Sequence, residues 1–447
     1  MHTVSATSLS TTPPLTHGQF LKLSLPLILS GLSTPLLGAV DTAVVGQLPH
    51  PAYIGGVAIG ALIFNYLYWV LGFLRVSTSG FTAQAQGAGN TQDLLMFLLR
   101  PLGIALIMGC LFISLQSPIK YLSLLLMESS PVVEAQASSY FDIRIWGAPF
   151  VLANYVILGW LIGISKVKLA LFLQIFMNLL NIGLDLYFVL VLQWGVPGVA
   201  LATVISEVSA IVVGLLLLLA SRKMDWGQWS WSHYWDSRSF LKMFKVNRDL
   251  FIRTICLLTV FGTFTAYGSK LGEVTLAANA ILMQLQFILA YFFGGFANAS
   301  SILIGRSIGS KNEALFDATI RVTVLWSIMA SVLLALGLFL AQGWIISLFT
   351  AIKEVKALAS EYIIWLLLFP FAVFWGLQLE GICAGATNAR PVRNTMILSM
   401  IIFLASVWLL TPIWNNHGLW CSFVLFSLSR SLISWTYLPK LRKSSFS

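Results

Sequence analysis

The chain has 447 residues, of which 58% are hydrophobic and only 9% are charged. Soluble domains carry roughly 25% charged residues, so this composition excludes an ordinary soluble protein. The formal net charge is +10. Because the basic residues gather beside segments predicted to lie on one side of a membrane, contact with anionic lipid explains this charge. A nucleic-acid partner is therefore not expected.

Apolar runs of about twenty residues, long enough to cross a ~30 Å hydrocarbon core as helices, recur along the chain. They predict an all-α integral membrane protein with twelve transmembrane helices. The predicted helices lie at residues 19–45, 54–78, 94–116, 136–163, 169–192, 196–220, 250–271, 277–303, 319–342, 357–386, 393–414 and 418–438. The first run has no basic segment before it and no small-residue cleavage site after it, so we expect it to be retained as a helix.

The basic residues predict the orientation of these helices. When both termini are placed inside, the outside loops hold Lys120, Lys270, Lys353 and Lys356, while most of the other basic residues fall in or beside inside segments. Inside loops of membrane proteins are enriched in lysine and arginine. We therefore expect a multi-pass protein of the plasma membrane with both termini in the cytoplasm.

The chain also matches itself weakly at a shift of roughly 220 to 222 residues. The segment ASSY (137–140) corresponds to ASEY (359–362), and Pro149 corresponds to Pro370. Because the shift spans six helices, an even number, it predicts two parallel-repeat six-helix lobes around a central cavity. The predicted domains are an N-terminal lobe (1–220, helices 1 to 6, with the coupling site), a cytoplasmic interlobe linker (221–249) and a C-terminal lobe (250–447, helices 7 to 12).

Acidic residues inside the predicted helices are few. They are Asp41, Asp142, Asp185, Glu207 and Glu380. Four of the five belong to the first half, so the two lobes are expected to be similar in shape but different in chemistry, with coupling in the N-terminal lobe. An ionisable residue within the membrane is costly and often functional.

Structural roles remain as alternatives for these acids. Asp41 lies near the outer boundary and is able to reach water there, whereas Asp185 is able to satisfy its carboxylate by hydrogen bonds in the core. Asp142 is close to Tyr140 and Arg144, where structural pairing and function are both compatible with the sequence. Glu380 has Arg390 and Arg393 beyond it, so an ion pair on the inner side is favoured. Glu207 lies near the middle of the membrane, where lining the transport path and a structural role are equally compatible with the sequence.

Helical geometry brings four polar residues to similar depth. At 1.5 Å per residue, Asp41 of helix 1, Asp185 of helix 5 and Thr203 of helix 6 all fall in the outer half of the membrane. Asn181 precedes Asp185 by four positions and shares its helix face. The four side chains are therefore candidates for one site that binds a proton or another cation.

Two carboxylates brought together in a low dielectric repel each other, so at least one is expected to hold a proton near neutral pH. The cost of the remaining charge is what links the proton to conformation. Pro26 and Pro35 each remove a backbone hydrogen bond from helix 1, so they predict a helix that bends easily below Asp41.

Several sequence segments together resemble one transporter family. The helix 1 text PLILSGLSTPLLGAVDTAVVGQL, the TAQAQGAGN segment, the NLLNIGLDLYFV run and the GVPGVALATVIS run, in this order and spacing, resemble the multidrug and toxic compound extrusion (MATE) family over nearly the whole chain. The segments VNRDLFIRT and LAANAILMQ resemble its DNA-damage-inducible DinF branch, whose setting is the bacterial inner membrane.

This resemblance implies secondary active efflux of amphipathic, often cationic compounds by alternating access, without a cofactor. It implies proton coupling at Asp41, with Asn181, Asp185 and Thr203 in the same site. The other large branch uses an acid of helix 7 for sodium coupling, but helix 7 of this chain has no acid before the outer loop. Sodium at the four-residue N-lobe site stays open as the alternative, since its oxygen ligands also suit a hard cation.

The expected partners are drug-like small molecules and the bilayer, and we expect a functional monomer. Tyr140, Asn154 and Glu207 are candidate substrate-cavity residues. An enzyme is not expected, because the sequence has no P-loop, HExxH or GxSxG motif, and no metal-ligand cluster is expected either.

The nearest alternative is a flippase for lipids or lipid-linked oligosaccharides with a related helical plan. Such a protein needs basic groups in its cavity to hold phosphate. Few basic residues lie within the predicted helices, and the main candidates are Arg75, Arg144 and Arg253.

Overall fold

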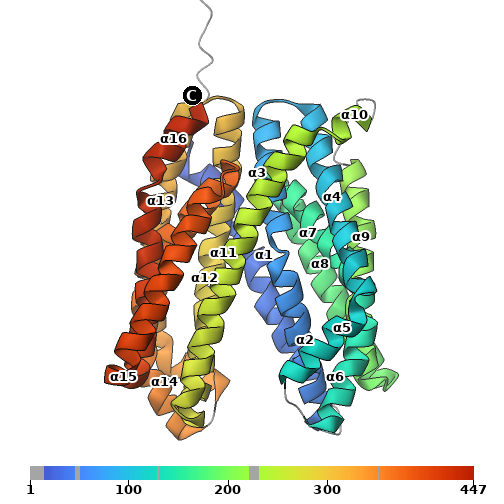
Figure 1. Ribbon diagram of the computed structural model, residues 1–447, viewed down its shortest axis with the longest axis vertical. Coiled ribbons are helices and arrows are strands. Elements are labelled where there is room, and N and C mark those ends of the chain that lie inside the picture. The colour runs from blue at the N-terminus through green and yellow to red at the C-terminus, as the bar shows by residue number, and fades with distance from the viewer. Residues whose placement is uncertain (1–14, 46–50, 128–129, 221–230, 351, 447) are drawn as a thin grey trace, which may run out of the picture.

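The computed structural model describes residues 15–45, 51–127, 130–220, 231–350 and 352–446 (Figure 1). The first half forms helices α1 (His17–Val45), α2 (Pro51–Val70), α3 (Phe73–Gly87), α4 (Thr91–Ser114), α5 (Gln116–Met127), α6 (Pro131–Arg144), α7 (Ala148–Gly163), α8 (Val167–Leu186) and α9 (Gly195–Ala220). The second half forms α10 (Trp231–Tyr234), α11 (Ser237–Lys270), α12 (Glu273–Gly309), α13 (Glu313–Phe349), α14 (Lys353–Gly385), α15 (Arg390–Trp435) and α16 (Leu438–Phe446).

The helices form two bundles that stand side by side (Figure 1). One bundle contains α1 to α9 and the other contains α11 to α16. Helix α10 lies at the upper end of the first bundle, and the C terminus lies at the upper end of the second. We call this end of the molecule the linker end. Ten described segments are long and apolar enough to cross a membrane. The predicted all-α, two-lobed membrane fold is confirmed.

The last two predicted helices, 393–414 and 418–438, lie within α15. Asn415 has φ 48° and ψ −127°, which is not helical, and there the chain turns back on itself. Gly418 lies against Leu410, where an added Cβ would be only 2.3 Å from the carbonyl oxygen, so only glycine fits. Because of this turn, the first and last residues of α15 both lie at the linker end.

Several predicted helix boundaries were wrong, and the start of the seventh helix differs most. It was expected at residue 250, but α11 already begins at Ser237. Its buried residues Met243, Val246 and Leu250 follow helical spacing and pack with Phe81 and Ala389. The helix continues into the polar segment because one of its faces is apolar and buried.

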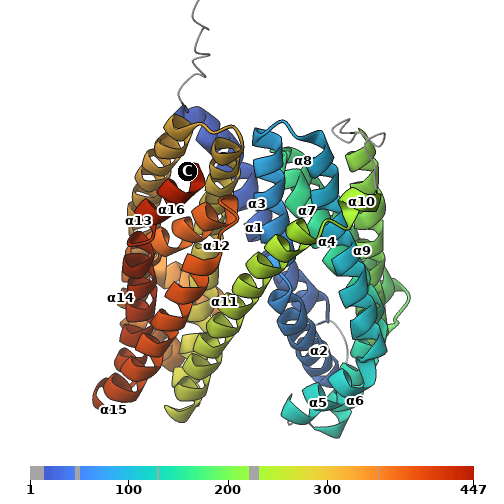
Figure 2. The same ribbon diagram turned by 45° about the horizontal axis from the view of Figure 1, so that its top comes forward.

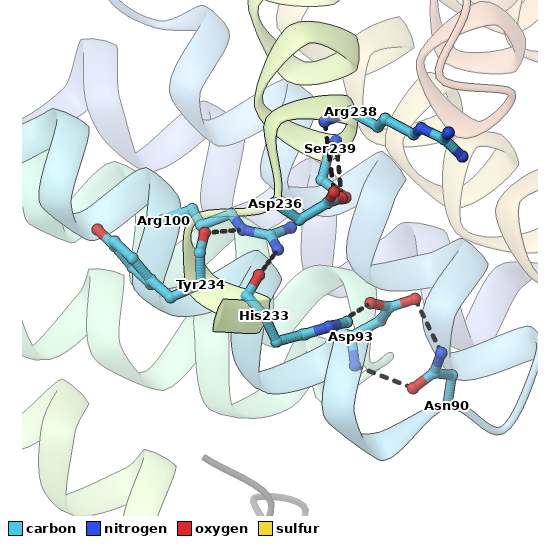
Figure 3. A network of polar contacts seen from close by, with 8 residues as sticks. All are labelled: Asn90, Asp93, Arg100, His233, Tyr234, Asp236, Arg238 and Ser239. Atoms are coloured by element: carbon cyan, nitrogen blue, oxygen red, sulfur yellow. Dashed lines mark hydrogen bonds and ion pairs between the residues drawn. The ribbon is translucent and has the colours of Figure 1, made fainter. Parts of the chain in front are cut away.

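Figure 3 shows how the linker is attached to the N-terminal lobe. The guanidinium of Arg100, on α4, is fully buried and donates to the backbone carbonyls of His233 and Tyr234. The imidazole of His233 lies 3.2 Å from a carboxylate oxygen of Asp93. Asp236 then caps α11 by accepting a hydrogen bond from the backbone N–H of Ser239 at 3.0 Å.

The two lobes contact each other through α1, which packs along α12, and through α3, which packs on α12 and α14 at the linker end. Gly80 lies so close to α14 that an added Cβ would be 2.1 Å from the carbonyl oxygen of Ala384. The amide of Gln84 donates to the carbonyl of Gly385 at 2.9 Å, and the hydroxyl of Thr387 donates back to Gln84 at 3.4 Å. Away from this end the bundles diverge, with α2 and α11 splayed apart (Figure 2).

We expect the substitution Gly80→Val to push the lobes apart at the linker end, because the new side chain would overlap the backbone of α14. Spin labels at Thr91→Cys and Ala314→Cys, in a chain whose native cysteines are replaced, would then be farther apart when their distance is measured by double electron–electron resonance spectroscopy. Gly337→Val is the matched control, since nothing lies within 4 Å of the Cβ position there. An unchanged distance in folded Gly80→Val would contradict this role of the glycine contact.

Candidate functional site

A stripe of polar side chains runs along the buried face of α8. Gln174, Asn178, Asn181 and Asp185 are 8%, 6%, 2% and 0% exposed. Their spacing of four, three and four residues places them on one face of the helix. The opposite face is apolar and exposed, as at Leu179. In a membrane protein this pattern turns the polar face toward the other helices and away from lipid.

The stripe faces α1 and α9. The amide of Asn178 lies 3.5 Å from the backbone carbonyl of Ser33, on α1. The amide nitrogen of Asn181 lies 3.5 Å from the hydroxyl oxygen of Thr203, on α9. This hydroxyl itself donates to the carbonyl of Val199 at 3.0 Å, so it presents its lone pairs to Asn181.

The four predicted coupling residues are described to different extents. Asn181 and Thr203 are brought together, and Asp185 lies one turn from Asn181 on the same buried face of α8. The side-chain oxygen of Asn181 has no hydrogen-bond partner among the described residues. The backbone of Asp41 belongs to α1, but its side chain lies outside the described part of the structure.

The two prolines predicted to bend helix 1 lie within the same helix. α1 runs from His17 to Val45 and includes both Pro26 and Pro35. Bending at these positions stays a prediction.

A change of helical type follows Asp185 directly and was not apparent from the sequence. Residues Tyr187–Val191 form a π-helical turn, closed by a hydrogen bond from the backbone N–H of Leu192 to the carbonyl of Tyr187 at 3.0 Å. Trp194 then stacks on Phe188, with ring centroids 4.9 Å apart. Single π-helical turns occur often at functional sites, where they shift the following residues around the helix.

The candidate substrate-cavity residues Tyr140, Asn154 and Glu207 lie around a buried ion pair. Both carboxylate oxygens of Glu207 accept from the guanidinium of Arg144, one of them at 2.7 Å. The amide of Asn154 donates to the backbone carbonyl of Glu207 at 3.2 Å. Tyr140 is 5% exposed and packs directly against Gly60. In this conformation the three residues are therefore part of the packed interior, and their contact with substrate stays a prediction.

Arg144 was the partner that sequence reasoning missed. It lies 63 positions from Glu207, and its guanidinium also lies over the rings of Phe64 and Tyr68, at 5.4 and 5.3 Å. Two arene faces and a bidentate carboxylate offset much of the cost of burying this cation. Asp142, two residues earlier, turns the other way and pairs with Lys120 at 2.8 Å. Asp142 is therefore paired, but with a different partner.

In the C-terminal lobe the expected ion pair of Glu380 is also present with other partners. Arg253 donates to both carboxylate oxygens, at 3.1 and 2.7 Å, and Arg430 lies 2.5 Å from one of them. The expected partners Arg390 and Arg393 do not take part, and Arg393 pairs with Asp249 instead. The acid of helix 10 is therefore held by arginines of α11 and α15.

Comparison with known proteins gives consistent relatives. "DNA damage-inducible protein F" of Escherichia coli (strain K12) is 38% identical over 411 residues, covering 92% of this chain and 89% of the relative. "Probable multidrug resistance protein NorM" of Photorhabdus laumondii subsp. laumondii is 23% identical over 386 residues, covering 84% and 83%. A solved structure described as "Outward-facing conformation of a multidrug resistance MATE family transporter of the MOP superfamily" shares the fold, with a TM-score of 0.84 at 19% identity over 95% of this chain and 96% of that one.

The two-lobed bundle of membrane helices, with a polar stripe buried in its first lobe, defines a polytopic membrane protein of the transporter type. The MatE family model matches residues 26–187 and 250–409, one stretch in each lobe, and the chain belongs to this family. The resemblance noted from sequence segments is thereby confirmed.

Proposed function

We propose that this protein is a secondary active multidrug efflux transporter that exchanges amphipathic, often cationic compounds for protons by alternating access. The observation that carries the proposal is the polar stripe of α8, a helix that packs on α1, and the stripe ends in the fully buried Asp185. The family membership and the descriptions of its relatives as multidrug resistance proteins and transporters support the same function.

In this proposal the coupling site consists of Asp41, Asn181, Asp185 and Thr203. Protonation of Asp41 from outside removes its charge, α1 repacks about its prolines, and the drug leaves the N-lobe outward. Return to the inward state delivers the proton to the cytoplasm. Asn181 and Thr203 supply the polar surroundings that a carboxylate needs when it ionises away from water.

We place the linker end in the cytoplasm, so that both termini are inside the bacterial inner membrane. The segments that carry Lys120, Lys270 and Lys353 lie at the other end (Figure 1), where few basic residues are expected. With the lobes in contact at the linker end, this conformation is then an outward-facing one. In this proposal the protein works as a monomer and needs only the proton gradient. Contact of Tyr140, Asn154 and Glu207 with the substrate stays part of the proposal, since all three side chains are buried in this conformation.

Sodium is the second candidate for the coupling ion. The observation in its favour is the side-chain oxygen of Asn181, which has no partner among the described residues and lies one turn from a buried carboxylate. Such oxygens are suitable ligands for a hard cation.

A flippase is less consistent with the ion pairs. Of its three candidate phosphate-binding residues, Arg144 is already held by Glu207 and Arg253 by Glu380. Paired arginines have little charge left for a phosphate group, because the carboxylate occupies the same donors.

The test is efflux of a fluorescent cationic dye from proteoliposomes under an imposed pH gradient or an imposed sodium gradient. Wild-type protein is expected to respond to the pH gradient, and Asp41→Asn to lose the response, because an amide does not release a proton. Asp142→Asn is the control, since its carboxylate is 53% exposed and pairs with Lys120 outside the site. Full pH-driven efflux by Asp41→Asn would refute proton coupling at this residue, and a response to sodium alone would favour the second candidate.

A further inference from the structure

A cavity of about 290 Å³ lies at the linker end of the C-terminal lobe. It is formed where the first turn of α15 meets Tyr437 and α16, and its lining includes Arg390, Asn394, Tyr437 and Lys440. Its volume is at the lower end of that of small-molecule sites, so it fits a headgroup better than a drug-sized compound.

The cavity carries a positive charge that nothing in it neutralises. None of its lining residues is acidic, and among the described residues neither Arg390 nor Lys440 has an ion-pair partner. The neighbouring cations are different, since Arg393 pairs with Asp249 at 2.9 Å and Arg442 with Asp317 at 2.8 Å. The nearby acids are therefore already used, and the two cavity cations are left for a ligand.

Neutral donors complement these two cations. The side-chain oxygen of Asn394 accepts from the guanidinium of Arg393 at 2.8 and 3.1 Å, which leaves the N–H groups of this amide for another partner. The N-terminal turn of α15 adds its positive dipole end at Arg390. Cations with amide donors are the groups that bind phosphate.

The surroundings place the cavity at the depth of lipid headgroups. Trp435 is 56% exposed at the end of α15, and Tyr437 lies in the cavity wall two residues later. Tryptophan and tyrosine gather at the boundary between hydrocarbon and water. Leu441 is buried against the C-terminal lobe, while Lys440 and Lys443 are exposed, so the outer face of α16 presents basic side chains at this depth, where anionic headgroups attract them.

We propose that this cavity binds the phosphate of an anionic lipid headgroup in the leaflet at the linker end, with Arg390 and Lys440 as its two charged contacts. The site is separate from the coupling site, which lies in the other lobe. The test measures lipid binding and not transport, so its outcome does not depend on the proposed function.

The test is titration of the purified, full-length protein with phosphatidylglycerol, followed by native mass spectrometry. We expect Arg390→Gln and Lys440→Gln each to weaken binding about fivefold, and the double variant about 25-fold, since each cation near an anionic headgroup contributes a comparable amount. The matched control is Lys311→Gln with Lys168→Gln, two exposed basic residues at the same end that neither line the cavity nor belong to α16.

Two further results test the source of the phosphate, and a third tests the site. Phosphatidylcholine, whose net charge is zero, is expected to bind more weakly than phosphatidylglycerol and to respond less to the double variant. Inorganic phosphate at millimolar concentration is expected not to displace the lipid, and displacement would overturn the lipid in favour of a free anion. Equal binding of phosphatidylglycerol by the folded double variant and the wild-type protein would overturn the site itself.

Discussion

Replacing Asp185 by asparagine is expected to reduce gradient-driven efflux to the level measured without a gradient. Asp185 is 0% exposed and lies at the end of the polar stripe of α8, one turn from Asn181. The asparagine keeps the size of the side chain but is not able to change its charge, so a proton or a cation no longer alters the electrostatic energy of this part of the lobe. Dye efflux from proteoliposomes is the measurement.

The stability of the variant separates coupling from folding. Because asparagine has nearly the same shape as aspartate and leaves no cavity, Asp185→Asn is expected to fold and to unfold at a temperature close to that of the wild-type protein. Dye binding without transport would then locate the defect in coupling. Retention of the full pH-driven rate would exclude Asp185 from the coupling site.

The largest loss of stability is expected from breaking the buried ion pair of the N-terminal lobe. Arg144→Met leaves the carboxylate of Glu207 buried without its partner, and both side chains are 8% exposed in the intact pair. Loss of one member of such a pair costs about 3–5 kcal/mol. Thermal unfolding of the purified variant, followed by light scattering and tryptophan fluorescence, measures this loss.

The double variant Arg144→Met with Glu207→Leu distinguishes a charge effect from a packing effect. Removing both charges is expected to recover most of the stability, because well-packed apolar residues often replace a buried ion pair without cost. Lys120→Met is the control for an exposed pair, where the loss is expected to stay below about 1 kcal/mol. A double variant as unstable as Arg144→Met alone would show that the contacts of Arg144 with Phe64 and Tyr68 dominate instead.

Much of the fold was predictable because membrane helices are specified locally. Each needs an apolar run of sufficient length, and such runs are visible in the sequence. Even the break between the last two predicted helices is present, at Asn415. The start of α11 at Ser237 was missed, since the helix continues into a charged segment whose buried face only becomes apparent beside Phe81.

The candidate site was predictable only where its residues share one helix. The four-residue spacing of Asn181 and Asp185 is by itself enough to place them on one face of α8. Pairing between helices does not follow from spacing. Glu207 and Arg144 are 63 positions apart, and the partners of Asp142 and Glu380 lie on helices whose rotation the apolar pattern leaves undetermined. Helix rotation is set by packing, which a single sequence does not display.

The attachment of α10 to α4 makes the following helix a lever. Only Trp235 and Asp236 separate the anchored turn from α11, and α11 then extends for 34 residues into the opposite lobe. At 1.5 Å per residue its length is about 51 Å, so a tilt of about 10° at this pivot moves its far end by about 9 Å. We therefore expect a small rotation of the turn that Arg100 holds to produce a much larger displacement at the far end of α11, away from the linker end.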